Sequence, residues 1–154
     1  MNLTQTTFNL IFFFQILQLN TLNANGRLYF LPSGDNIAQY AIETAIKNSK
    51  KEILISANNV SWNIKKLIIK RSDIDVTLLS NCKKLEHNIF EMTLYKHIDI
   101  KCKFTKSPTT MLFDRKNLCF IDSTFILCSE DSNIIREYKK NIDKILENSK
   151  SYLK

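Results

Sequence analysis

Ser107, Thr109 and Asp114 are the residues of this 154-residue chain whose types and spacing come nearest to a catalytic centre. Two hydroxyls stand one residue apart, and a carboxylate follows the second after four intervening residues. A serine without an adjacent base is a poor nucleophile at neutral pH, and a threonine offers a hydrogen bond but no positive charge. Taken alone, these three residues lack an activated nucleophile and a cation to hold a charged substrate.

The cysteines are the other group that could do chemistry, and they stand at positions 82, 102, 119 and 128. Their spacing contains no CxxC pair and matches no zinc signature, so we expect neither a metal nor a cofactor. Three of them, Cys102, Cys119 and Cys128, fall in apolar strands, which favours free, buried thiols that act as small hydrophobic residues. A bridge between Cys119 and Cys128 stays open because their strands are consecutive.

A predicted strand–turn–strand hairpin carries Asp114 in its acidic turn, and further strands and helices must position it. Apolar residues recur at helical spacing over residues 36–50, whereas the short apolar runs 53–55 and 76–79 suit central strands buried on both faces. The alternation of strands and helices predicts an α/β domain with a mixed sheet and helices on both faces. The expected strands are 27–31, 52–57, 74–79, 98–104, 110–113, 117–121 and 125–128, and the expected helices are 36–50, 62–71, 85–96 and 132–153.

Three segments, taken in order, resemble the phospholipase D superfamily, in particular its short bacterial exported members with one catalytic motif per chain. LYFLPSGDNIAQYAIETAIKNSKKEILISA is similar to the family's opening strand, helix and strand. IKKLIIKRSDIDVTLLS is similar to its helix followed by Arg-Gly-Val-x-Val, with Ser72 and Asp73 in place of the glycine step. SPTTMLFDRKNLCFIDSTF lines up with the catalytic His-x-Lys-x4-Asp. The resemblance covers nearly all of residues 27–150 and implies one phospholipase D-like domain over residues 25–154.

The resemblance implies a phosphodiesterase architecture whose reacting groups have been replaced. In the family the His attacks phosphorus, the Lys holds phosphate oxygens, the Asp orients an imidazole, and two chains pair to bring two motifs together. Here Ser107 stands at the His position and Thr109 at the Lys position, while Asp114 matches. Asp122, at the family's Gly-Ser step, would repel a phosphate. We therefore expect a catalytically degenerate domain that forms a homodimer or pairs with an intact homologue.

A second alignment uses Arg115-x-Asn117-x4-Asp122, which keeps the spacing and puts a cation at the His position. It shortens the connection to the next strand, breaks the acidic turn, and also lacks the His and the Lys. Neither His87 nor His97 restores the motif, and we interpret both as surface or helix-face histidines.

The charge balance favours polyanionic partners. Lys and Arg number 22 against 15 Asp and Glu, a net charge of +7. We expect weak, salt-dependent binding of phospholipid head groups or nucleic acid. The basic residues are spread along the chain, so general solubility is an equal alternative explanation of the charge. With 2 Gly and 2 Pro, the composition excludes a low-complexity linker or a collagen-like segment.

Residues 1–24 carry no charge and have an apolar centre at residues 8–17, the layout of a secretory signal peptide with cleavage after Ala24. The usual Lys or Arg near Met1 is missing. Gln15 and Gln18 argue against a membrane-spanning helix. We expect export to the periplasm or the medium, and an uncleaved anchor through residues 8–19 is the second interpretation.

Three functions follow from these observations. The leading one is an exported, catalytically degenerate phospholipase D-like domain that binds phospholipid head groups or nucleic acid. The second is an active phosphodiesterase or endonuclease that uses unconventional groups, for example Ser107 or His97. The third is a small secreted α/β interaction module whose hairpin match is accidental. Turnover of a phosphodiester separates the first two, and convergence of Ser107, Thr109 and Asp114 at one pocket would argue against the third.

Overall fold

The structure is an eight-stranded mixed sheet in the order β1-β7-β6-β5-β2-β3-β4-β8. This computed structural model describes residues 28–32, 36–84, 87–103, 108–122 and 125–152. The neighbours β2, β3 and β4 run parallel, and every other pairing in the sheet is antiparallel. The strands are β1 Leu28–Pro32, β2 Glu52–Ser56, β3 Asp75–Ser80, β4 Ile98–Cys102, β5 Thr109–Phe113, β6 Asn117–Ile121, β7 Phe125–Ser129 and β8 Lys150–Ser151.

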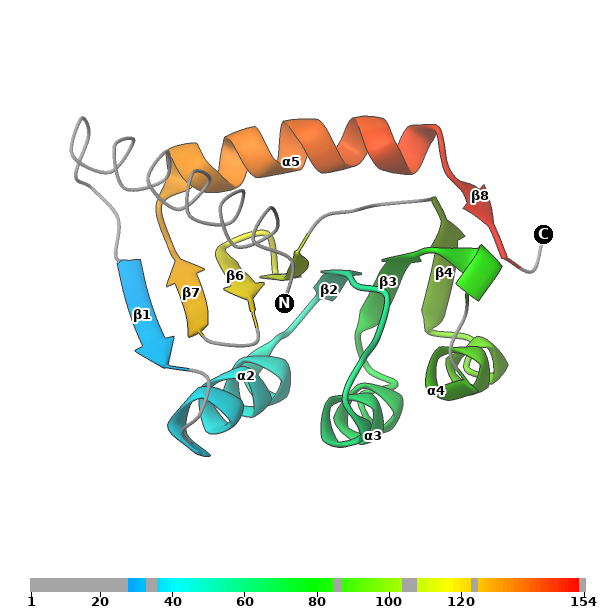
Figure 1. The fold of residues 1–154 in the computed structure, drawn as a ribbon, viewed down its shortest axis with the longest axis horizontal. Coiled ribbons are helices and arrows are strands. Elements are labelled where there is room, and N and C mark those ends of the chain that lie inside the picture. The colour runs from blue at the N-terminus through cyan, green and yellow to red at the C-terminus, as the bar shows by residue number, and fades with distance from the viewer. Residues whose placement is uncertain (1–27, 33–35, 85–86, 104–107, 123–124, 153–154) are drawn as a thin grey trace.

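Helices cover both faces of the sheet, as the sequence predicts. Figure 1 shows α2 (Asn36–Asn48), α3 (Trp62–Lys70) and the short α4 (His87–Phe90) beneath the sheet, with α5 (Ser132–Glu147) across its upper face. Each face of the central strands is therefore shielded from water, which explains why their sequences are continuously apolar rather than alternating.

The parallel strands give the sheet two distinct edges. We call the edge at which β2, β3 and β4 begin the amino edge, and the edge at which they end the carboxyl edge. Because β5 is antiparallel to β2, it begins at the carboxyl edge, where Thr110 pairs with Ser56, and ends at the amino edge, where Phe113 pairs with Ile53. The turn between β5 and β6 consequently lies at the amino edge.

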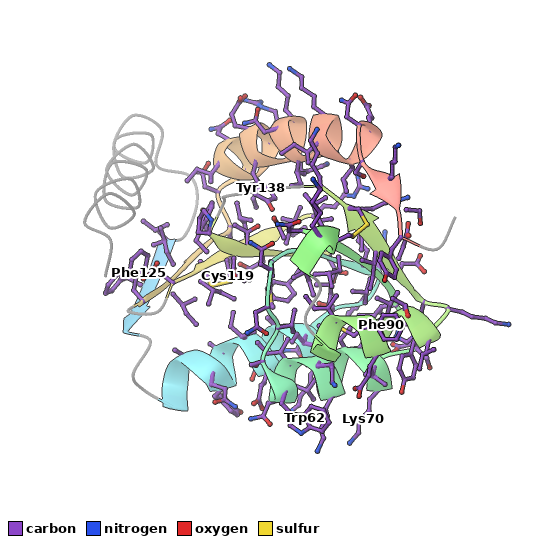
Figure 2. All side chains as sticks on the ribbon, turned by 45° about the vertical axis from the view of Figure 1, so that its right-hand side comes forward. Trp62, Lys70, Phe90, Cys119, Phe125 and Tyr138 are labelled. Carbon is purple, nitrogen blue, oxygen red and sulfur yellow. A yellow bond between two sulfur atoms is a disulfide. The ribbon has the colours of Figure 1, made fainter. Side chains whose placement is uncertain are left out.

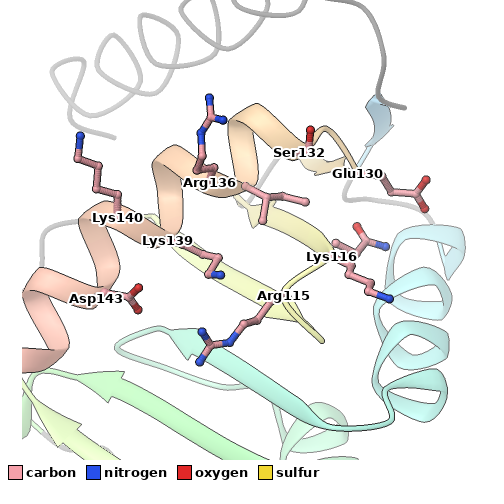
Figure 3. Close-up of a pocket in the computed structure, with 10 residues that line it drawn as sticks. Arg115, Lys116, Glu130, Ser132, Arg136, Lys139, Lys140 and Asp143 are labelled. Carbon is pink, nitrogen blue, oxygen red and sulfur yellow. The ribbon is translucent and has the colours of Figure 1, made fainter.

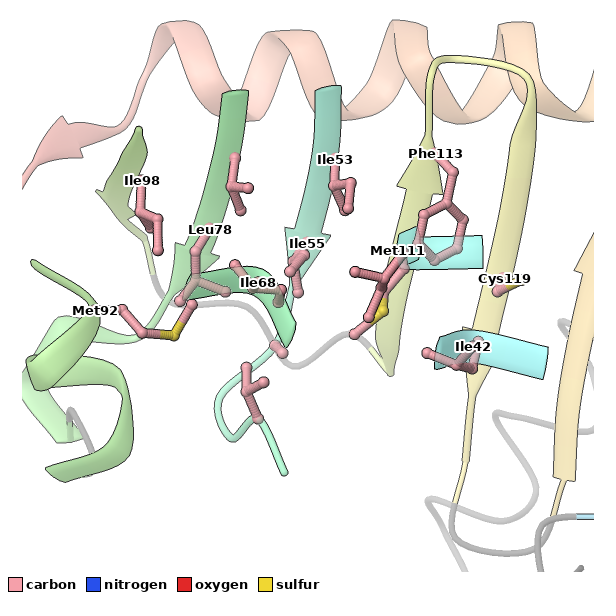
Figure 4. Packing of buried hydrophobic residues seen from close by; sticks show 14 of the residues in the cluster. Ile42, Ile53, Ile55, Ile68, Leu78, Met92, Ile98, Met111, Phe113 and Cys119 are labelled. Atoms are coloured by element: carbon pink, nitrogen blue, oxygen red, sulfur yellow. The ribbon is translucent and has the colours of Figure 1, made fainter. Parts of the chain in front are cut away.

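Two hydrophobic clusters hold the layers together. The larger lies between the sheet and α2 and α3, where Ile55, Leu78 and Ile68 are fully buried, and Figure 4 shows their packing. The smaller lies under α5, where Ile134 and Ile135 pack against strands β5 to β7. Each fully buried large aliphatic side chain contributes roughly 1.5–3 kcal/mol to the free energy of unfolding.

Tyr138 docks α5 onto the sheet. Its hydroxyl lies 2.5 Å from the hydroxyl of Thr110 on β5, and its ring meets Phe120 edge-on. Burial raises the pKa of Tyr138 to about 12, against the smaller opposing effect of the Thr110 hydrogen bond. Figure 2 shows Tyr138 between α5 and the sheet, whereas Trp62 and Lys70 lie on the opposite outer surface.

Arg71, a residue of the segment that resembles the family, has a structural role. Its guanidinium donates to the carbonyl oxygens of Ile46 and Lys47, each at 2.6 Å, and also to that of Ser49. These carbonyls belong to the last turn of α2 and the residue that follows it, where a helix leaves its acceptors unsatisfied. Arg71 therefore fixes the end of α2 against the connection from α3 to β3.

Two predicted helices are shorter than expected. The helix predicted over residues 85–96 is one α-helical turn followed by a 3₁₀ segment, Glu91–Leu94. The helix predicted over residues 132–153 ends at Glu147, and Lys150–Ser151 forms the edge strand β8 instead. Its pairing with Lys101 and Cys102 of β4 outweighs the helical pattern of the terminal residues, since tertiary context overrides local propensity.

The four cysteines form two disulfides, which corrects the prediction of free, buried thiols. Cys82 is bonded to Cys102, and Cys119 to Cys128, with Cα–Cα distances of 5.2 and 4.0 Å. The first bond joins the 3₁₀ segment Cys82–Lys84, which follows β3, to the last residue of β4. The second joins directly opposite residues of β6 and β7, so the bridge that the sequence left open is present.

Candidate functional site

The phospholipase D resemblance implies that a catalytic site would lie at the carboxyl edge, where β5 begins. Thr109 lies there, half-buried and opposite Ile121, so that Asp122 comes next along the neighbouring strand. Ser107 falls in residues 104–107, outside the described residues. Alternation along β5 places Thr109 on the face of Met111 and Phe113, which pack toward α2 and α3. Thr109 brings a hydroxyl and Asp122 a carboxylate to this edge, and neither side chain supplies a positive charge for a phosphate.

Asp114 lies at the other end of the same strand. Five residue steps along a strand correspond to about 16 Å, so Thr109 and Asp114 do not converge on one pocket. The carboxylate of Asp114 accepts hydrogen bonds from three successive backbone N–H groups, those of Lys50 at 2.9 Å, Lys51 at 2.8 Å and Glu52 at 3.1 Å. Its partners are therefore the peptide groups at the start of β2, whereas the family's Asp, by the resemblance, orients an imidazole.

These contacts also set the charge of Asp114. Burial alone would raise the pKa of its carboxyl group, but hydrogen bonds from the backbone N–H groups of Lys50, Lys51 and Glu52 bring that pKa below its usual value. A carboxylate that accepts several backbone hydrogen bonds is stabilised in its charged form. Asp114 is thus held as an anion that ties the β5–β6 turn to β2.

The histidines do not supply a catalytic base beside Thr109 in the part of the chain that the structure describes. His97 is half-buried at the amino edge, with a ring nitrogen 3.2 Å from the carbonyl oxygen of Ile68. It therefore lies at the opposite edge of the sheet from Thr109, which argues against its recruitment into the motif. His87 begins α4, and its side chain is outside the description.

The residues of the second alignment, Arg115, Asn117 and Asp122, also lie far apart in the structure. Arg115 is in the turn at the amino edge, and Asn117 begins β6 at that edge. Asp122 follows the last residue of β6 at the carboxyl edge. The three residues of this pattern span the whole length of a strand and form no common site.

A cavity lies at the amino edge, between the β5–β6 turn and α5. It is an open groove of about 900 Å³. In Figure 3, Lys139 of α5 points toward Arg115 of the turn, whereas Arg136 and Lys140 extend from α5 away from the turn. We call it the basic groove. Its lining residues are Arg115, Lys116, Asn117, Glu130, Ser132, Ile135, Arg136, Lys139, Lys140 and Asp143.

The sequence alone does not reveal this site, because its cations come from two segments. Arg115 and Lys116 are some twenty residues from the basic residues of α5, so the charges look dispersed along the chain. One signal was available: Arg136, Lys139 and Lys140 follow the i, i+3, i+4 pattern that places side chains on one face of a helix.

The turn that presents Arg115 is conformationally strained. Asp114 and Arg115 have φ angles of 50° and 58°, and the N–H of Lys116 donates to the carbonyl of Phe113 at 2.9 Å. Positive φ at both central residues is the geometry of a type I′ hairpin turn, which favours Asn and Gly. Arg115 is held by an ion pair with Glu52, and that hydrogen-bonded contact raises the pKa of Arg115. The ion pair and the Asp114 contacts offset this strain.

Among the described residues, no helix is long and apolar enough to cross a bilayer. The same residues contain no group of three or more His, Cys, Asp and Glu side chains suited to a metal ion.

Comparison with known proteins identifies the fold. No protein-family model matches the sequence, and no curated protein sequence matches it. Solved structures do match in fold. NucT from Helicobacter pylori aligns with a TM-score of 0.67 at 15% identity, over 83% of this chain and 99% of that one. Nuc from Salmonella typhimurium, a phospholipase D family member, aligns with a TM-score of 0.62 at 13% identity, over 83% and 97%.

The archaeal chromatin protein TrmBL2, whose structure shows a novel mode of DNA binding, aligns with a TM-score of 0.64 at 12% identity. The match covers 96% of this chain and 63% of the TrmBL2 chain, so this chain spans less than two thirds of that protein. The fold is that of the phospholipase D family, as the sequence predicts. At these identities the likeness establishes the fold alone.

Proposed function

We propose that this chain is an exported, catalytically degenerate phospholipase D-like domain that binds the phosphodiester groups of nucleic acid or of phospholipid head groups. The observation that carries the proposal is a phospholipase D-like fold in which Thr109 begins β5 and Asp122 follows β6, at positions that the resemblance aligns with the family motif. By the resemblance, those positions hold a lysine and a serine in active relatives.

The missing groups account for the expected loss of catalysis. Acid–base help from a positioned histidine is typically worth about 10²–10⁴-fold in rate. The family's lysine would add electrostatic stabilisation of the transition state, which neither a threonine hydroxyl nor a carboxylate supplies. The basic groove lies at the other edge of the sheet, so its cations do not replace that lysine.

Two proteins of similar fold support the proposal that this chain binds a polyanion. TrmBL2 binds DNA by a novel mode, and Nuc is a phospholipase D family member. Together with a net charge of +7, these similarities favour a phosphate-bearing ligand held by weak, salt-dependent contacts.

The catalytic part of the proposal is tested by hydrolysis of bis(p-nitrophenyl) phosphate and of plasmid DNA by the purified secreted chain. We expect no turnover above background. Ser107→His with Thr109→Lys and Asp122→Ser rebuilds the motif, and we expect this triple variant to hydrolyse the reporter measurably faster, because nucleophile and positioning act together. If the unmodified chain hydrolyses the reporter and Ser107→Ala abolishes that hydrolysis, the degenerate-enzyme proposal is wrong.

Pairing of two chains remains part of the proposal, because the family builds its site from two motifs. Light scattering of the purified chain distinguishes a homodimer from a monomer. A monomer would leave a mixed pair with an intact homologue as the arrangement to test.

A binding module that recognises another protein is the second candidate, and one observation favours it. Phe90, Leu94 and Tyr95 are exposed by 47%, 76% and 38%, although all three are large and apolar. Clustered exposed apolar residues commonly mark interaction sites. Since the chain has the phospholipase D fold, this candidate no longer requires an accidental hairpin match.

A further inference from the structure

The basic groove carries a net positive charge that the protein leaves largely unneutralised. Five cationic and two anionic side chains line it, a net charge of +3. Glu52 pairs with Arg115. Within the described part of the chain, no ion pair engages Lys116, Arg136, Lys139 or Lys140. Arg136 donates to the side chain of Asn133, which leaves its charge uncompensated.

The groove has two opposed basic walls on rigid supports. One wall is the β5–β6 turn, which Asp114 fixes through its three backbone contacts to the start of β2. The other wall is α5, whose N-terminus is capped by the buried side chain of Asp131, which accepts from the backbone N–H groups of Asn133 and Ile134. Two walls whose geometry is set before binding reduce the ordering cost of holding a ligand between them.

The composition of the groove favours nucleic acid over a membrane surface as its ligand. Proteins that dock on anionic lipid combine basic residues with exposed aromatic or aliphatic ones. Ile135 is the one large apolar residue among the described residues that line the groove, and it is buried. The large apolar side chains that are exposed in the described part of the chain lie elsewhere, at Phe30, Tyr40, Trp62, Phe90, Leu94 and Tyr95.

The lining also favours a duplex over a single strand. Proteins that bind single-stranded nucleic acid stack bases on aromatic side chains, and the groove has no aromatic residue among its described lining. Arg136 and Lys140 are four residues apart on α5, a rise of about 6 Å. Side chains four residues apart lie on one face of a helix. Both cations can therefore contact the phosphates of one backbone strand.

We propose that the basic groove binds the phosphate backbone of double-stranded nucleic acid without reading its base sequence. This inference rests on the polyanion-binding part of the proposed function and places that binding at the amino edge. Phosphate contacts from lysine and arginine position a protein on a duplex but carry no sequence information. The carboxyl edge, which the family resemblance selects, is then not the main binding surface.

The test uses fluorescence anisotropy of a labelled 20-base-pair DNA duplex with the purified secreted chain, over a series of salt concentrations. The double variant Arg136→Gln/Lys140→Gln removes two exposed charges one helical turn apart. Its matched control, Lys66→Gln/Lys70→Gln, removes two exposed charges at the same spacing on α3, on the opposite face of the sheet. A third variant, Lys83→Gln/Lys103→Gln, removes two charges at the carboxyl edge. Circular dichroism confirms that all variants are folded.

We expect the groove variant to lose about ten-fold or more in affinity near 0.1 M salt. The plot of log affinity against log salt should become less steep, its negative slope shrinking by about two. The α3 control should change both quantities much less. The loss should be equal for duplexes of unrelated sequence, and weaker binding is expected for the matching single strand.

Each other outcome overturns the inference, and two of them separate it from the proposed function. Duplex binding that only the carboxyl-edge variant weakens would refute the groove while leaving polyanion binding intact. Absence of duplex binding together with sedimentation on vesicles containing 30% phosphatidylserine would refute the groove and favour the lipid ligand. Absence of both would refute the groove and the polyanion part of the proposed function.

Discussion

Asp114 matches the family's catalytic motif, but its contacts in this structure are structural rather than catalytic. The family resemblance assigns its carboxylate to an imidazole, whereas in this chain the carboxylate accepts from the backbone N–H groups of Lys50, Lys51 and Glu52. A carboxylate so placed holds together two segments that are more than sixty residues apart. A residue that matches a catalytic motif can therefore be retained for the fold after its catalytic partners have been replaced.

Asp114→Asn should lower the free energy of unfolding by about 2 kcal/mol at pH 7, because charge-assisted hydrogen bonds to the backbone are replaced by weaker neutral ones. The pKa of Asp114 is lowered in the folded state. Its contribution is therefore complete above the unfolded-state pKa of about 3.9 and is lost as the pH falls through the lower folded-state value.

Urea unfolding at pH 7 and below pH 3 measures this effect. The difference between the unmodified chain and Asp114→Asn should shrink at the lower pH. Asp75→Asn, which changes an exposed carboxylate at the same edge, serves as the control and should have little effect at either pH. An equal deficit of Asp114→Asn at both pH values would contradict the charged role of Asp114.

At the scale of elements, the two disulfides hold strands together in different environments. Cys119 and Cys128 are buried within the core between β6 and β7, with 2% and 9% of their surface exposed. Cys82 and Cys102 are half-buried at the carboxyl edge. In the chain-entropy model, loops of 9 and 20 residues correspond to roughly 2.5 and 3 kcal/mol of stabilisation.

Reduction should therefore open Cys82–Cys102 first, because attack on a disulfide requires access of the attacking thiolate to the sulfur. Native protein treated with increasing dithiothreitol, then alkylated and analysed by peptide mass spectrometry, should show labelled Cys82 and Cys102 before labelled Cys119 and Cys128. In urea, where the core is open, the order should disappear. Simultaneous labelling of all four cysteines in the native protein would contradict the difference in protection.

At the scale of the whole molecule, the disulfides and the distribution of charge are those expected of an exported protein that binds polyanions. Two disulfides suit an oxidising compartment, where such bonds form and persist. This agrees with the export expected from the uncharged first 24 residues. The fold also concentrates five of the 22 basic residues in one groove, so a chain with dispersed charges presents a focused positive field.

Export predicts a mature chain that begins at Asn25, with its four cysteines oxidised. Expression of the complete chain in a bacterial host, followed by N-terminal sequencing of the periplasmic or secreted product and thiol titration, measures both. A product of full length in the membrane fraction would favour the anchor through residues 8–19. Full-length protein confined to the cytoplasm with free thiols would contradict export.

The sequence by itself determined the parts of the fold that depend on local patterns. Continuous apolar runs identified β2 and β3 as central strands, and alternation of strands with amphipathic helices predicted a mixed sheet covered on both faces. The hairpin strand over Asn117–Ile121 was predicted with its bounds. These features are encoded by residues close together in the chain, whose periodicity decides which face is buried.

Only the tertiary structure decided how distant residues meet. It joined Cys82 to Cys102, turned Lys150–Ser151 into an edge strand, gave Asp114 its backbone partners, and brought the β5–β6 turn against α5 to form the basic groove. Each of these depends on contacts between segments far apart in sequence, which periodicity and propensity do not specify. The helical pattern of the last residues does not decide their structure. Pairing with β4 gives their backbone N–H and C=O groups hydrogen-bond partners in the sheet.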